Sequence, residues 1–304
     1  MSESTVITPT RRGGILLRFV LLALTWGSSF LFVAVALTGL SPAQVVLGRL
    51  VTGAVALAAT CALTRQRLPR GLAAWGHLFV VGMLLCVIPF LLFAWAQQDV
   101  SSGVASIYNA TTPLMTMLVS LIALREERPT PARGIGVVVG FAGVLVVLAP
   151  WAGVGGGSVL AQLACLGATL SYGIAFVYLR RFVTPLGLGA VPVATVQVGL
   201  GTVVMLLLAP CLAAESIDLS LPVVLAVLAL GALGTGLAYV WNTRIVAAWG
   251  ATNASTVTYL TPVVGVVLGV VVLGERLSWN EPIGAAVVIL GIAITQGRVR
   301  IRRG

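Results

Sequence analysis

Charged residues are scarce in this chain of 304 residues. Asp, Glu, Lys and Arg together make up 9% of the sequence, and hydrophobic residues make up 59%. Soluble globular proteins carry roughly 25% charged residues. A surface exposed to water cannot be built from so few charges. The composition therefore excludes a soluble enzyme, a nucleic-acid-binding module and a disordered chain, and it predicts an integral membrane protein.

Cysteine and histidine are also rare. Cys61, Cys86, Cys165 and Cys211 lie far apart, within or at the ends of apolar runs, and His77 is the only histidine. No Cys-x-x-Cys motif and no cysteine–histidine pairing occurs, so the usual zinc and haem motifs are excluded. We expect neither a metal nor another cofactor, and we interpret the cysteines as small packing residues.

Long apolar runs fill most of the chain. They are apolar on all sides, and most are long enough to cross a bilayer as a helix, which takes about 20 residues. The alternation typical of membrane strands is absent. The sequence predicts an all-α membrane protein with ten transmembrane helices, between a polar N-terminal segment (1–14) and a basic tail (298–304). The ten runs are 15–38, 41–63, 72–95, 101–123, 132–149, 157–179, 187–212, 221–243, 250–273 and 281–297.

Arginine is unevenly distributed between the loops, and lysine is absent. Alternate loops and the C-terminus hold most of the arginines, whereas the loops between them hold almost none apart from Arg276. Because cytoplasmic loops carry an excess of basic residues, both termini are predicted to lie in the cytoplasm, on a multi-pass protein of the plasma (inner) membrane. The arginines behind this prediction are Arg65, Arg67, Arg70, Arg125, Arg128, Arg133, Arg180, Arg181, Arg244, Arg298, Arg300, Arg302 and Arg303.

An internal repeat relates the two halves of the chain. Pro113 is followed by Glu127-Arg128 and then by two glycines, and Pro262 is followed by Glu275-Arg276 and two glycines at nearly the same spacing. Each half contains five runs. Since five is odd, the second half would enter the membrane from the opposite side. The pattern predicts two inverted repeats, 15–149 and 157–297, an arrangement frequent among secondary transporters.

Several segments resemble the drug/metabolite transporter superfamily, EamA type. They are LTWGSSFLFVAVAL at 24–37, SPAQVVLGRL at 41–50, ASIYNATTPLMTMLVSLIALREE at 105–127, and the stretch from ASTVTYLTPVV to AAVVILGI at 254–292. The resemblance covers nearly the whole chain. It implies ten spans, two EamA repeats, an inner-membrane location and transport of small metabolites, but it does not fix the substrate.

Arg49 is the only charged residue well inside a predicted span. An arginine in the hydrocarbon region costs about 2.5–3.5 kcal/mol on insertion scales and usually faces a bundle interior or a watery cavity. One interpretation is a fixed positive charge that binds a carboxylate or phosphate. The other is a structural arginine that bonds carbonyls at the end of a neighbouring helix. The sequence does not decide between them.

Pro89, Pro113 and Pro262 lie inside the predicted spans 72–95, 101–123 and 250–273. Each removes a backbone donor and kinks its helix, so we predict that they act as hinges; the alternative is that they only shape packing. Polar and aromatic residues gather near these kinks. We predict that a binding cavity is formed by Trp26, Ser29, Arg49, Tyr108, Asn109, Thr112, Tyr172, Thr258 and Tyr259, with Tyr108 and Thr112 on one helix face.

No carboxylate lies in the middle of a predicted span, which disfavours proton antiport through such a group. The sequence favours a secondary transporter that exports amino acids or related small metabolites by alternating access. Efflux of drugs or toxic compounds on the same scaffold is the alternative. An intramembrane enzyme is a remote one, since it would need a serine facing the lone His77. Expected partners are a small-molecule substrate and the lipid bilayer, and the chain is expected to be a monomer or a homodimer.

Overall fold

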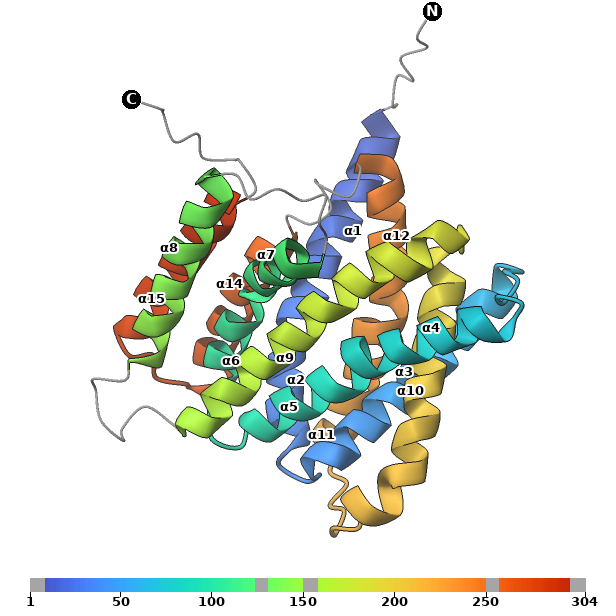
Figure 1. Cartoon of the computed structure of the whole chain (residues 1–304). Coiled ribbons are helices and arrows are strands. Elements are labelled where there is room, and N and C mark those ends of the chain that lie inside the picture. Colours follow the sequence, from blue (N-terminus) through green and yellow to red (C-terminus); the bar gives the residue numbers. More distant parts are fainter. Residues whose placement is uncertain (1–8, 124–130, 150–157, 250–256, 296–304) are drawn as a thin grey trace, which may run out of the picture.

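The computed structural model describes residues 9–123, 131–149, 158–249 and 257–295. All regular structure in these ranges is helical, as predicted (Figure 1). The Glu127-Arg128 pair, the basic tail (298–304), Arg125 and the first eight residues of the N-terminal segment lie outside the described residues.

The described residues of the first half of the chain form eight α-helices. One π-helical segment, η1 (Met83–Val87), connects α4 to α5 without a break. The helices are α1 (Pro9–Gly27), α2 (Ser29–Ala36), α3 (Pro42–Leu63), α4 (Leu72–Gly82), α5 (Ile88–Ala96), α6 (Ser102–Asn109), α7 (Thr112–Ala123) and α8 (Pro131–Leu148).

The second half likewise consists of α-helices with short π-helical and 3₁₀ segments between some of them. Its elements are α9 (Val159–Tyr178), η3 (Leu179–Val183), η4 (Thr184–Leu186), α10 (Ala190–Leu212), α11 (Leu221–Leu228), η5 (Ala229–Leu237), α12 (Ala238–Trp249), α14 (Val257–Leu273) and α15 (Asn280–Thr295). Both η3 and η5 are π-helical, and η4 is a 3₁₀ turn.

Within the described ranges, seven helical segments are long and apolar enough to cross a membrane. Three shorter apolar helices are 134–148, 257–273 and 280–295. Large apolar side chains also remain on the outside of the bundle, as lipid-facing residues do; Ile122 is 86% exposed and Leu207 is 75% exposed. These features describe a helical membrane protein. Ten crossings and the inverted pairing of the two halves stay predictions.

Matched Thr-Pro pairs occur in α7 and α14. A proline leaves the carbonyl four residues earlier without its usual N–H partner. Thr112 Oγ1 donates to the carbonyl of Asn109 at 2.7 Å, four residues before Pro113. In the same way, Thr261 Oγ1 donates to the carbonyl of Thr258 at 3.0 Å, four residues before Pro262. The preceding threonine thus satisfies the carbonyl that each proline leaves open.

The two prolines nevertheless sit in different local structures. Pro113 follows an interruption, because α6 ends at Asn109 and α7 begins at Thr112. Pro262 lies inside the continuous helix α14. Pro89 lies in the first turn of α5, directly after the π-helical η1. A hinge role for the three prolines stays a prediction.

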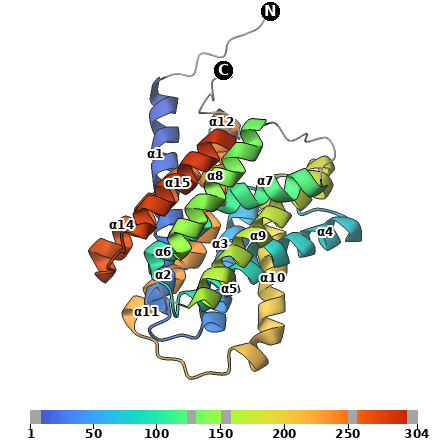
Figure 2. The same ribbon diagram turned by 60° about the vertical axis from the view of Figure 1, so that its left-hand side comes forward.

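Helices α8 and α15 pack backbone against backbone at one edge of the bundle (Figures 1 and 2). A Cβ placed on Gly143 would lie 2.6 Å from the amide nitrogen of Val288, and one on Gly284 would lie 2.8 Å from the carbonyl oxygen of Gly143. Small residues are needed where helices approach so closely. Helices from both halves of the chain surround a cavity.

Candidate binding cavity

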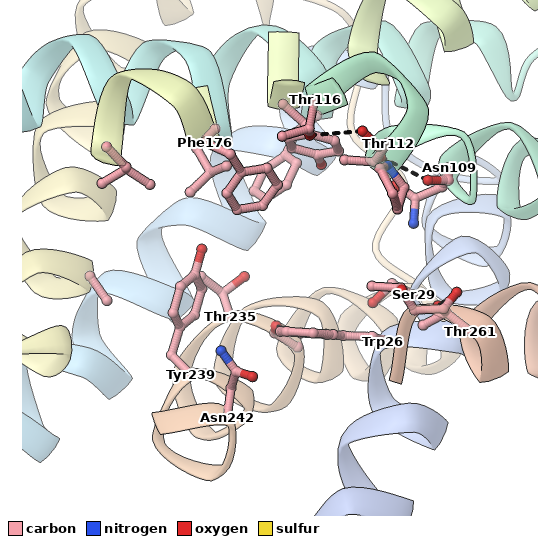
Figure 3. A pocket seen from close by; sticks show the side chains of 18 of the residues that line it. Trp26, Ser29, Asn109, Thr112, Thr116, Phe176, Thr235, Tyr239, Asn242 and Thr261 are labelled. Carbon is pink, nitrogen blue, oxygen red and sulfur yellow. Dashed lines mark hydrogen bonds between the residues drawn. The ribbon is translucent and has the colours of Figure 1, made fainter. Parts of the chain in front are cut away.

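A cavity of about 750 Å³ lies among the helices (Figure 3). Its wall draws residues from both halves of the chain, including α1, α3, α5 and α7 from the first half and α9, α10, η5 and α12 from the second. Ligand pockets commonly have this size and combine an apolar wall with a few polar groups.

Most residues predicted to form a binding site line this cavity. Asn109 and Thr112 reach it from the interruption between α6 and α7, and Trp26 and Ser29 from the break between α1 and α2. The proline at position 113 is also part of the wall. The predicted residues in the wall are Trp26, Ser29, Arg49, Asn109, Thr112, Tyr172 and Thr258.

Two predicted residues lie elsewhere. Tyr108 is 1% exposed, and its hydroxyl donates to Gln162 Oε1 at 2.5 Å, away from the cavity wall. Tyr259 packs against the same hydrophobic cluster as Tyr108. The prediction that Tyr108 and Thr112 share one face assumed an unbroken helix. The interruption at residues 110–111 separates them, so Thr112 faces the cavity and Tyr108 does not.

Arg49 is half-buried in the cavity wall. Its guanidinium carbon lies 3.7 Å from the centre of the Phe90 ring, which is a cation–π geometry. Its Nε donates to Thr235 Oγ1 at 3.3 Å. No aspartate or glutamate lines the cavity in the part of the chain that the structure describes. A ring and a hydroxyl therefore hold the guanidinium, and no carboxylate in the wall neutralises it.

Aromatic side chains form the apolar part of the wall. Phe30 and Phe93 pack edge to face with ring centres 5.4 Å apart, and Phe93 and Tyr172 lie 6.3 Å apart. A hydrogen bond to the second half of the chain holds the side chain of Trp26 in place, because its Nε1 donates to the carbonyl of Gly234 at 3.2 Å. Figure 3 shows this indole extending along the cavity.

Hydroxyl groups supply hydrogen-bond acceptors to the cavity. Each donates its hydrogen to a backbone carbonyl of the preceding helical turn, as in Thr116 to Thr112 at 2.8 Å (Figure 3). With the hydrogen committed in this way, the hydroxyl oxygen offers the cavity lone pairs only. The residues that share this geometry are Ser29, Thr112, Thr116, Thr235, Thr243 and Thr261.

Sequence reasoning missed two glutamines in the wall, Gln97 and Gln197. Gln197 lies in the middle of α10 among apolar residues, and this isolation within a span was the available signal. Gln97 lies just beyond the predicted span 72–95. Both polar atoms of its side chain are buried without a hydrogen-bond partner in the described structure.

The cavity reaches the surface where α9 ends and α10 begins. Exposed residues of its wall at this end include Phe176, Arg180 and Ala190. We call this the open end. At the opposite, closed end, loops of the two halves touch. Gln44 Nε2 donates to the carbonyl of Glu215 at 2.7 Å, and the N–H of Asp218 donates to the carbonyl of Gly39 at 2.9 Å.

His77 has a structural environment outside the cavity. Its Nδ1 lies 2.8 Å from the Tyr178 hydroxyl, and its ring stacks on Phe182 with centres 5.4 Å apart. Ser28 and Ser29, which lie within the first predicted span, both hydrogen-bond to the carbonyl of Thr25. The described residues thus place no serine against this histidine.

Comparisons with known proteins identify the relatives of this chain. It is 28% identical to "Uncharacterized transporter YdfC" of Bacillus subtilis (strain 168) over 90% of this chain and 88% of that protein. It is 26% identical to "Uncharacterized inner membrane transporter YedA" of Escherichia coli (strain K12), over 90% of this chain and 87% of that protein. It is 28% identical to the "Probable terminal-alkyne amino-acid exporter" of Streptantibioticus cattleyicolor, over 93% and 94%.

A solved crystal structure shares the fold, with a TM-score of 0.63 at 21% identity, covering 93% of this chain and 96% of that one. The model of the EamA-like transporter family matches twice, over residues 13–149 and 159–296. Together the two matches cover almost the entire sequence. The chain therefore belongs to the EamA-like transporter family.

Proposed function

We propose that this protein is a secondary transporter of the inner membrane that exports amino acids or related small metabolites bearing a carboxylate. It works by alternating access between two inverted repeats (15–149 and 157–297) of five helices each, with both termini in the cytoplasm. In this orientation the open end of the cavity faces the cytoplasm, where an exporter collects its substrate.

The single observation that carries the proposal is the position of Arg49. A guanidinium taken out of bulk water needs a counter-charge, and no carboxylate in the described wall supplies one. A substrate carboxylate fits the need, because the planar fork of arginine binds it through two hydrogen bonds. Phe90 and Thr235 hold the guanidinium in position, and they leave its far edge for the substrate carboxylate.

Two further observations support the proposal. A relative 28% identical over 93% of the chain carries the name of an amino-acid exporter. The family model matches two consecutive segments of similar length, which is the sequence pattern of a duplicated transporter. The resemblance to the drug/metabolite transporter superfamily agrees with both.

The test is counterflow into liposomes with purified protein, first against a panel of amino acids. Arg49→Lys is expected to lower uptake clearly, since lysine cannot reproduce the two-point contact. A methyl ester of the accepted amino acid is expected to compete poorly. Arg70→Gln, at an exposed residue outside the cavity, serves as control. Normal folding and transport by Arg49→Gln would contradict the proposal.

Efflux of drugs is a second candidate, favoured by the aromatic wall of Phe30, Phe93 and Tyr172. The unneutralised charge of Arg49 argues against cationic drugs. Uptake of a cationic dye by the same liposomes, unaffected by amino acids, would favour this candidate over the first.

A further inference from the structure

Gln197 is a buried polar residue with an incomplete set of hydrogen bonds. Its side chain lines the cavity and is 2% exposed. Nε2 donates to the Tyr239 hydroxyl oxygen at 3.4 Å. Oε1 of the same amide is buried and has no hydrogen-bond partner in the described structure. Because buried polar atoms are normally paired, this position favours a ligand that brings a donor.

Gln197 and Arg49 border the same part of the cavity. Arg49 Nε donates to the hydroxyl of Thr235. Thr235 lies one helical turn before Tyr239, whose hydroxyl oxygen accepts a hydrogen bond from the side-chain amide of Gln197. Figure 3 shows Thr235 and Tyr239 next to each other on one wall. A ligand held by the arginine is therefore within reach of the glutamine.

Several groups around this corner accept hydrogen bonds. The hydroxyl hydrogens of Thr235 and Thr243 are committed to the carbonyls of Leu230 and Tyr239, at 3.2 and 2.8 Å. Their oxygens, together with Gln197 Oε1, are neutral acceptors beside a cation. Such a corner complements a ligand in which a carboxylate is adjacent to a group rich in N–H donors.

We propose that Gln197 Oε1 accepts a hydrogen bond from the ammonium group of an α-amino acid whose carboxylate is bound by Arg49. Gln197 is then the residue that distinguishes amino acids from carboxylic acids without the amine. The terminal torsion of a glutamine is broad, so the amide can turn its oxygen toward the ligand. A neutral amide suits this place, because a carboxylate there would pair with Arg49 and compete with the substrate. The inference rests on the proposed function.

The test compares matched ligands on the full-length protein in detergent by calorimetry. The pairs are L-leucine with 4-methylpentanoate and L-phenylalanine with 3-phenylpropanoate; an N-trimethyl derivative of each amino acid keeps the charge but has no N–H. Wild type is expected to bind at least one amino acid about tenfold or more tightly than its two analogues, as fits a hydrogen bond to a charged group. Equal binding of amino acid and deamino acid by wild type would overturn the inference without any variant.

The variant Gln197→Met keeps the side-chain volume and removes the acceptor. It is expected to reduce the preference for the amine to near unity while its affinity for the deamino acid changes less than about twofold. Gln98→Met, at an exposed residue outside the cavity, is expected to keep the wild-type preference. An equal loss for both ligands, or no change, would overturn the inference.

The two proposals fail in different ways. If wild type binds neither the amino acids nor the deamino acids, the carboxylate proposal for Arg49 fails and this inference fails with it. If binding depends on Arg49 but not on Gln197, only the inference fails.

Discussion

The carboxylate of Glu275 caps helix α6 through Ser102, whose backbone N–H donates to Oε1 at 2.7 Å. Oε2 accepts the N–H of Gly103 at 2.9 Å. Glu275 follows α14, in the second half of the chain, whereas α6 belongs to the first. This contact therefore joins the two halves, and it lies at the end of α6 that points away from Asn109 and the cavity.

Glu275→Ala is expected to destabilise the protein by about 1–3 kcal/mol, because a helix cap and two hydrogen bonds to a charged acceptor are lost together. Thermal or chemical unfolding in detergent measures the effect. The control is Glu215→Ala, since the side chain of Glu215 is exposed on a loop. Equal stabilities of the two variants would show that the cap contributes nothing.

Gly269 leaves room for this carboxylate. A Cβ at this position would lie 2.9 Å from the carboxyl carbon of Glu275, closer than side chains tolerate. Gly269→Ala is therefore expected to displace the carboxylate and to lower stability about as much as Glu275→Ala does. The double variant is expected to be less destabilised than the two single losses added together, since both remove one contact.

The control for this double-mutant cycle of Glu275 and Gly269 is Gly199→Ala. Apart from the neighbouring backbone of α10 itself, no atom of the described residues lies within 4 Å of a Cβ at that position. The substitution is expected to be neutral or to stabilise the helix by up to about 1 kcal/mol. Strict additivity in the cycle would contradict the steric explanation.

Helix positions were predictable from the sequence because the runs are apolar on all sides and hydropathy marks them directly. The prediction of which side chains face the cavity was less accurate. The interruption before Pro113 and the π-helical turns of η1, η3 and η5 change which residues face inward. Tyr108 illustrates the result, because its side chain faces away from the cavity that Asn109 lines.

Other parts of the site depend on contacts between distant segments. Arg49 and Thr235 are 186 residues apart, and Glu275 and Ser102 are 173 apart. No local pattern encodes such pairs. Gln197 could have been found, because a lone amide in an apolar span is conspicuous, whereas its unpaired Oε1 becomes visible only once the neighbouring helices are in place.

Cysteine labelling tests the predicted orientation. Ser41 is an unsuitable site, because it is 7% exposed and caps α3. Thr38 and Leu219 are exposed at the closed end, and Gln66 and Thr184 are exposed in loops that the arginine pattern places inside. In a background without native cysteines, a reagent that cannot cross the membrane is expected to label the first two in intact cells.

The two cytoplasmic positions are expected to react only after the cells are permeabilised. Cys211 is exposed and must be replaced in this background, whereas the other three cysteines are buried. Labelling of Gln66 and Thr184 sites in intact cells, without labelling of the other two, would reverse the orientation.

Substitution of the two matched prolines tests the hinge prediction. Pro113→Ala restores a backbone N–H that can donate to the carbonyl of Asn109, in place of the Thr112 hydroxyl that now does so. The two short helices α6 and α7 can then join, which would stiffen the segment that carries both residues to the cavity. We expect transport to slow several-fold while substrate affinity changes much less.

Pro262→Ala is expected to have the same kind of effect but a smaller one, because α14 is already continuous there. Counterflow rates and equilibrium binding of one amino acid, measured on the same preparations, separate the two quantities. Equal defects in transport and binding, or none in either, would assign both prolines to packing alone.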